Sequence, residues 1–146
     1  MITQQVAGHV TAEVYAEVQQ FYAEHMQLLD GGVVDAWAET FTEDATFAVP
    51  TLPEPTRGRE QLRETLRRTT QELAAAQEQR RHWHGMVAVF PNDDGSLRVR
   101  CYALVFATRR EQQPVLHRVC VCEDVLVREG GRLLVKTRKV TRDDLP

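Results

Sequence analysis

The sequence changes character at RRHWHGMVAVF, residues 80–90. Before this stretch most apolar residues recur at helical spacing, and after it the chain is rich in the β-branched and aromatic residues typical of strands. The apolar second half of the stretch predicts a strand over residues 82–90. Because side chains alternate along a strand, we expect His82 and His84 on one face and Trp83 on the other. Histidine changes charge near neutral pH, so this face is a candidate acid–base site, unless both histidines are structural.

Three helices are predicted before this strand. The first begins after Thr11, whose hydroxyl is suited to cap it, and ends at Asp30-Gly31-Gly32, where glycine favours the backbone conformation that terminates a helix. The third helix starts at Gly58 and extends to about residue 79. Between them we expect a short second helix, a short strand and a proline-rich loop at the rim of the domain, over residues 34–41, 45–49 and 50–56.

Three further strands are predicted in the last third of the chain, over residues 97–108, 114–127 and 132–140. Helices followed by consecutive antiparallel strands are typical of an α+β fold, in which the helices cover one face of a twisted sheet and leave a pocket beneath them. The whole chain, residues 1–146, is expected to form a single domain. Several strands are apolar on both faces, and a homodimer formed through the sheet would cover the second face.

Composition and charge exclude several classes of function. The net charge of −3 and the sequence pI of about 6.0 give no general attraction to nucleic acid. No apolar run is long enough to span a membrane, and the N-terminus has no signal-peptide pattern. The three cysteines, Cys101, Cys120 and Cys122, are an odd number without zinc-type spacing. Two of them lie in an apolar strand run, as expected of buried thiols in a reducing, cytoplasmic location.

Asp30 stands at the C-terminal end of the first predicted helix, where the helix dipole disfavours a carboxylate. Two explanations stay open. Asp30 is a turn-forming residue beside Gly31, or it points into the pocket and orients His82 by fixing the tautomer of the imidazole. In the second case the pair can remove a proton next to a carbonyl group, or protonate a leaving hydroxyl.

Two segments resemble a known family: LLDGGVVDAWAETFTEDATF, residues 28–47, and PTRGREQL, residues 55–62. They are similar to the NTF2-like superfamily in its SnoaL-like branch, and the order of the predicted elements agrees over nearly the whole chain. The resemblance implies a cone-shaped α+β fold with three N-terminal helices packed on a curved antiparallel sheet, usually as a homodimer.

Within that branch the sequence looks similar to scytalone dehydratase, to bile-acid dehydratases and to small cyclases or dehydratases of actinobacterial aromatic polyketide clusters. The resemblance implies Asp30 and His82 as the catalytic pair, because His82 begins an H-x-x-G motif. It implies a cofactor-independent dehydratase or cyclase, a lyase of antibiotic-type polyketide biosynthesis. The substrate would be a small aromatic or polycyclic molecule, either free or tethered to a carrier protein. The polar residues that scytalone dehydratase carries on the following strands are replaced here, near Ala107, Cys120 and Cys122.

Two other functions are known in proteins that the sequence resembles. One is a non-catalytic helper subunit like the beta subunits of ring-hydroxylating dioxygenases, which share the opening motif. The other is an epoxide hydrolase or isomerase, which needs a water molecule held by a set of residues like Asp/Arg/Asp. Arg118 or Arg138 could contribute to such a set, although the rest of it is not evident in the sequence.

Six further residues are candidates to contact a substrate, although most of them fit the core equally well. They are Tyr22, Trp37, Phe47, His84, Met86 and His117. His25 lies on the apolar stripe of the first helix and is expected to be a core histidine. A metal site of the cupin type, built on the His-x-His pair with His117 and Glu123, lacks a glutamate at the required spacing. The sequence therefore predicts no metal and no cofactor.

Overall fold

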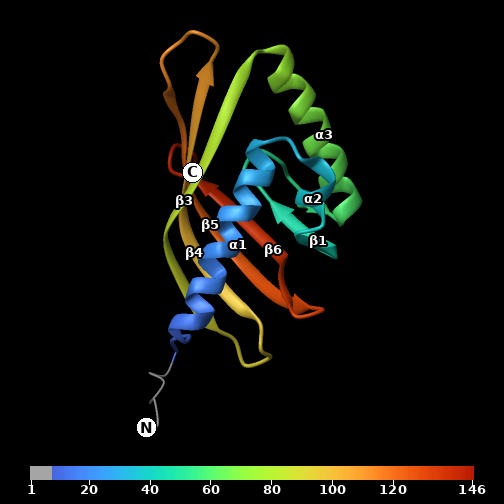
Figure 1. The fold of residues 1–146 in the computed structure, drawn as a ribbon, viewed down its shortest axis with the longest axis vertical. Coiled ribbons are helices and arrows are strands. Elements are labelled where there is room, and N and C mark those ends of the chain that lie inside the picture. Colours follow the sequence, from blue (N-terminus) through green and yellow to red (C-terminus); the bar gives the residue numbers. More distant parts are fainter. Residues whose placement is uncertain (1–7) are drawn as a thin grey trace.

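Three helices cover one face of a six-stranded sheet in the computed structural model, which describes residues 8–146 (Figure 1). The helices are α1 (Ala12–Asp30), α2 (Val34–Ala38) and α3 (Arg59–Ala75). The strands are β1 (Phe41–Ala48), β2 (Thr56–Arg57), β3 (Glu78–Pro91), β4 (Leu97–Arg109), β5 (Val115–Glu129) and β6 (Arg132–Arg142). The sheet order is β2-β1-β6-β5-β4-β3. The predicted α+β fold, with helices on a curved and mainly antiparallel sheet, is confirmed.

One strand pair differs from the predicted antiparallel arrangement. β1 lies beside β6 and runs parallel to it, with Thr46 opposite Thr137, whereas the other neighbouring strands among residues 8–146 are antiparallel. The two strands are separated by most of the chain, so no local pattern in the sequence reveals the pairing. The two residues of β2 extend the sheet beyond β1, within a segment that the sequence predicts to be loop and helix start.

Two predicted boundaries are wrong by several residues. Phe41 begins β1, although the sequence places it in the second helix, and β3 begins at Glu78, inside the predicted third helix. The first residues of β3 are polar, and strand prediction from apolar alternation therefore misses them. They nevertheless pair with β4, Glu78 opposite Arg109 and Arg80 opposite Ala107.

Helix α1 has a defined cap at each end. The Thr11 hydroxyl oxygen accepts a hydrogen bond from the Val14 N–H at 3.2 Å, as predicted. At the other end the Val33 N–H donates to the Leu28 carbonyl at 3.0 Å, and Gly32 takes a left-handed φ of +66°. This is the Schellman arrangement, which satisfies the last carbonyls of a helix. It fixes where the last helical residue, Asp30, stands relative to the sheet.

Strand β3 contains a bulge that changes which side chains face the helices. The pairing with β4 shifts between Gly85 and Ala88, and Met86 takes a left-handed φ of +51°. Inward-facing residues are even-numbered before the bulge and odd-numbered after it, as the burial of Val87 and Val89 shows. Met86 is 79% exposed and faces away from the pocket, contrary to its sequence-based assignment.

The core lies between the helices and the inner face of the sheet. Its fully buried side chains come from both layers, among them Val18, Phe41, Val99, Leu126 and Val135. Among residues 8–146, no helix lies over the opposite face of the sheet, where Trp83 is 64% and Tyr102 48% exposed (Figure 1). Among residues 8–146, no helix is both long enough and apolar enough to cross a membrane.

Candidate functional site

A cavity of about 520 Å³ lies between the sheet and the helices α1 and α3. Its wall is mainly apolar, with contributions from Leu29, Phe47, Leu66, Leu73 and Val105. The volume is within the roughly 300–1,000 Å³ that is usual for sites of small organic ligands. The predicted pocket beneath the helices is therefore present, and its size suits a molecule of two or three fused rings.

Asp30 and His82 are in direct contact at the wall of this cavity. The Nδ1 atom of His82 lies 2.6 Å from Oδ1 of Asp30, and the His82 backbone N–H donates to Oδ2 at 2.9 Å. The carboxylate therefore holds both the ring and the backbone of the histidine. The Asp30 side chain is only 7% exposed and that of His82 is 24% exposed. An ionised carboxylate accepts hydrogen bonds, so Nδ1 carries the proton and Nε2 is available to a ligand.

Local structure explains how two residues so far apart in sequence meet. The cap at Gly32 ends α1 with Asp30 beside the first half of β3. The Gln79 side-chain amide donates to the Asp30 carbonyl at 2.9 Å, which ties the end of the helix to the same strand. Asp30 thus occupies the turn beside Gly31, as the first explanation requires, while its carboxylate is directed at His82, as the second requires.

The other predicted site residues are divided between the cavity and the rest of the fold. Trp37, Phe47 and His84 line the cavity together with the Asp30–His82 pair. Tyr22 is buried, but its hydroxyl donates to Asp124 at 2.7 Å and the residue is not part of the cavity wall. His117 is exposed on β5 and, like Met86, does not line the cavity.

A buried ion pair beside the cavity was not predicted from the sequence as a structural unit. Arg138 of β6 donates from Nε and Nη2 to the two carboxylate oxygens of Asp124 on β5, at 2.9 and 2.8 Å. Burial would raise the pKa of the Asp124 carboxyl, but the Arg138 charge outweighs it and holds that pKa below its usual range. Burial and then the Asp124 charge raise the pKa of Tyr22 well above its usual value. The sequence did contain one signal of this ion pair, because Asp124 is a carboxylate among the inward-facing apolar residues of β5 and a buried carboxylate needs a partner.

His25 is a core residue, as expected. It is completely buried, and its Nδ1 lies 2.7 Å from the Thr40 hydroxyl oxygen. Its ring lies between those of Phe21 and Trp37, with both interplanar angles at 14°. Burial, and next the charge of Arg138, lower the pKa of His25 well below its usual value. The residue is therefore a neutral packing element and not a candidate acid.

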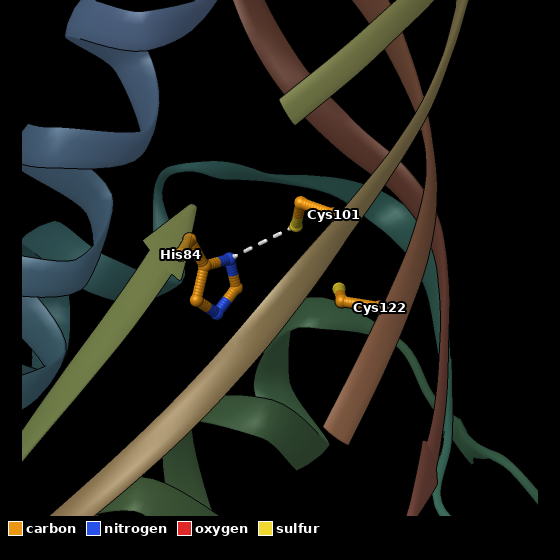
Figure 2. Close-up of side chains that lie close together, drawn as sticks. All are labelled: His84, Cys101 and Cys122. Atoms are coloured by element: carbon orange, nitrogen blue, oxygen red, sulfur yellow. Dashed lines mark hydrogen bonds between the residues drawn. The ribbon is translucent and has the colours of Figure 1, made fainter. Parts of the chain in front are cut away.

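One group of side chains among residues 8–146 has the composition of a metal site. It consists of His84, Cys101 and Cys122, whose nitrogen and sulfur atoms all lie within 4.8 Å of one another (Figure 2). The neighbouring thiol of Cys122 and then the His84 ring lower the pKa of the Cys101 thiol. Only His84 is shared with the cupin-type set of His82, His84, His117 and Glu123 that the sequence suggests.

Comparison with known proteins identifies the fold family. The sequence matches the SnoaL-like domain over residues 10–139. The chain belongs to the SnoaL-like family. ActVI-ORFA from Streptomyces coelicolor is 34% identical to this SnoaL-like chain, with a TM-score of 0.85 over 93% of this chain and 99% of that one. A protein from Catenulispora acidiphila in complex with S-DNPA is 36% identical, with a TM-score of 0.81 over 92% and 96%.

A more distant structure agrees in fold alone. An NTF2-like protein from Novosphingobium aromaticivorans is 23% identical, with a TM-score of 0.78 over 92% of this chain and 84% of that one. No match was found among curated protein sequences. The resemblance to the SnoaL-like branch is therefore confirmed, and the fold is the one seen in an NTF2-like protein.

Proposed function

We propose that this SnoaL-like chain is a cofactor-independent dehydratase or cyclase that acts on an aromatic, polyketide-type molecule. The observation that carries the proposal is the Asp30–His82 pair, with its 2.6 Å contact at the wall of a mainly apolar cavity. A carboxylate that fixes one nitrogen of an imidazole leaves the other as a positioned base. The volume of the cavity, about 520 Å³, and its mainly apolar wall support an aromatic ligand, and the 36% identical protein from Catenulispora acidiphila was solved in complex with S-DNPA.

The proposed reaction needs only proton transfer. Nε2 of His82 removes a proton from the carbon next to a ketone, and the electron pair is delocalised as an enolate. The imidazolium then gives this proton to the β-hydroxyl group, which leaves as water, and a carbon–carbon double bond forms. Asp30 stabilises the imidazolium between the two steps. The apolar wall excludes water and holds one conformer of the substrate, so that the carbon acid lies next to the base.

The guanidinium of Arg138, whose charge is balanced by Asp124, lies at the wall of the same cavity. Two of its guanidinium nitrogens are bonded to Asp124, which holds the group in a fixed orientation. A preorganised cation is suited to stabilise negative charge that develops on a substrate oxygen. We assign this secondary role to Arg138, in place of the role in an epoxide hydrolase that the sequence alone leaves open.

A bicyclic β-hydroxy ketone tests the proposal. Loss of water from 3-hydroxy-1-tetralone gives 1-naphthol, whose fluorescence reports turnover, and calorimetry with S-DNPA reports binding. We expect His82→Ala to lower kcat by about 100- to 10,000-fold, the usual contribution of a general acid–base group. We expect Asp30→Asn to lower it on the order of 100-fold, because the tautomer and charge of His82 are no longer controlled. Both variants should keep S-DNPA binding nearly unchanged.

Arg81→Gln is the matched control. Arg81 precedes His82 on β3 but belongs to the outward-facing, exposed positions of the strand, so turnover and binding should both equal those of the wild type. If wild-type protein binds S-DNPA but gives no 1-naphthol, the alternative is favoured, a non-catalytic binding subunit. Equal turnover in the wild type and His82→Ala would show that the Asp30–His82 pair does not take part in the reaction.

A further inference from the structure

The inner face of the sheet holds a histidine and two cysteines that the proposed reaction does not use. His84 lies on β3, Cys101 on β4 and Cys122 on β5, three strands that are neighbours in the sheet. Figure 2 shows the Nδ1 atom of His84 turned toward the sulfur of Cys101, with the sulfur of Cys122 close to both. Imidazole nitrogen and thiolate sulfur are the ligand types that zinc prefers.

The fold brings these atoms together through two features of the strand pairing. Cys101 and Cys122 are direct partners across β4 and β5, so their side chains leave the sheet side by side. The bulge at Gly85 and Met86 leaves Cys101 without a direct partner on β3, and His84, immediately before the bulge, occupies the space beside it. Bulges commonly re-aim side chains next to functional sites.

We propose that His84, Cys101 and Cys122 bind one zinc ion, with Nδ1 and the two sulfur atoms as ligands. In a tetrahedral site with Zn–S of about 2.3 Å and Zn–N of about 2.05 Å, the nitrogen and sulfur ligands are about 3.6 Å apart and the two sulfurs about 3.8 Å. The Nδ1 atom of His84 and the sulfur of Cys101 are 3.6 Å apart. All three ligand atoms lie within 4.8 Å of one another, which is close to the spacing that such a site requires.

The surroundings of the site are compatible with a divalent cation. Two thiolates neutralise the charge of the ion, and their protons are released to solvent on binding. The carboxylate of Asp124, whose Oδ1 lies 3.2 Å from the Cys122 sulfur, is paired with Arg138, so this second pair adds no net charge. His84 and Cys122 line the cavity, which gives the ion a route of entry and leaves the fourth position open to water.

The position of the His84 imidazole beside both sulfur atoms distinguishes this site from a simple pair of thiols. A disulfide between Cys101 and Cys122 would need only the cross-strand pairing of the two cysteines. It would not explain why Nδ1 of His84 is directed at the sulfur of Cys101. The ligand set also excludes Asp30 and His82, so zinc binding is measured independently of the proposed proton transfer.

Cobalt titration tests the site directly. Full-length protein is reduced, freed of metal with a chelator and titrated with Co²⁺, which reports thiolate ligation by a near-ultraviolet charge-transfer band and tetrahedral geometry by intense visible bands. We expect saturation at one equivalent, and displacement of the cobalt bands by one equivalent of Zn²⁺. Cys101→Ser and Cys122→Ser should each weaken Zn²⁺ binding on the order of 100-fold, and any cobalt that they still bind should give about half of the charge-transfer intensity.

Cys120→Ser is the matched control, because Cys120 is also a buried cysteine of β5 at the cavity wall but is outside the cluster. It should bind Co²⁺ like the wild type. His84→Gln removes the nitrogen ligand at a partly exposed position and gives an independent variant if a serine variant fails to fold. The proposal is overturned if reduced wild-type protein gives no thiolate band, if the band is unchanged in Cys101→Ser, or if Cys120→Ser abolishes it.

Discussion

The ion pair between Asp124 and Arg138 is almost completely shielded from solvent, with side chains 0% and 3% exposed. Asp124→Asn would leave the Arg138 guanidinium buried without a counter-charge. Because an unpaired buried charge is strongly unfavourable, we expect the free energy of unfolding to fall by about 3–5 kcal/mol. Urea denaturation followed by circular dichroism measures the loss.

Two controls separate this buried pair from ordinary surface charges. Glu17→Gln removes a partner of Arg128 at a half-exposed position and should cost about 1 kcal/mol or less. The double variant Asp124→Leu/Arg138→Met removes both charges and should recover most of the stability lost by Asp124→Asn. If Asp124→Asn is as stable as the wild type, the pair does not hold the strands together as the structure indicates.

The sequence predicted single residues well where the signal was local. Thr11 and Gly32 terminate α1 because their own chemistry favours capping and a left-handed backbone. The Asp30–His82 contact could be anticipated because Asp30 ends α1 and because the family resemblance pairs it with His82, although His82 lies within β3 and not at its start. The contact between Tyr22 and Asp124 could not, because the pair is separated by 102 positions and depends on the packing of α1 over β5.

The element that most directly controls the site is the end of α1. Gly32 has a φ of +66°, and a Cβ atom there would lie 2.8 Å from Cγ2 of Thr70 on α3. Gly32→Ala combines backbone strain with this clash, and we expect it to lower the free energy of unfolding by about 1–3 kcal/mol. Because the same turn positions Asp30, turnover of 3-hydroxy-1-tetralone should fall as well, which steady-state kinetics would detect.

A second substitution distinguishes strain from the clash. Gly95→Ala has the same kind of backbone, with a φ of +88°, but open space around the added methyl group, so it measures the cost of strain alone. Adding Thr70→Ala to Gly32→Ala removes the clashing methyl and should recover part of the stability. If Gly32→Ala costs no more than Gly95→Ala, the packing of this turn against α3 is not what fixes Asp30.

At the level of elements, sequence patterns identified which helices and strands exist better than how they are joined. The bulge in β3 depends on the register with β4, so nothing in the sequence indicated that Met86, named as a candidate substrate contact, faces away from the cavity. The parallel pairing of β1 with β6 likewise depends on two strands that are far apart in the sequence coming together in the folded sheet. Both features are long-range, which explains why capping and periodicity could not supply them.

Among residues 8–146, helices cover one face of the sheet, and the other face exposes several large apolar side chains beside charged ones such as Arg100 and Glu123. On the exposed face Trp83 lies opposite Leu104, and Tyr102 lies opposite Val121, so large apolar side chains are contiguous across three strands. Monomeric proteins rarely leave such a surface open to water, and a second copy offers a self-complementary cover. We therefore propose, as the sequence predicts, that the chain forms a homodimer through the outer faces of β3, β4 and β5.

Light scattering coupled to size-exclusion chromatography tests the dimer. The wild type should show twice the monomer mass of 16.7 kDa at micromolar concentration. Tyr102→Glu would bury a carboxylate from each copy in the interface or leave the interface open, so it should give the monomer mass and a lower melting temperature. Leu145→Glu changes an exposed leucine near the C-terminus instead, and should leave the dimer intact. A wild-type protein with the mass of one chain would contradict the proposal, and so would a Tyr102→Glu variant that stays dimeric.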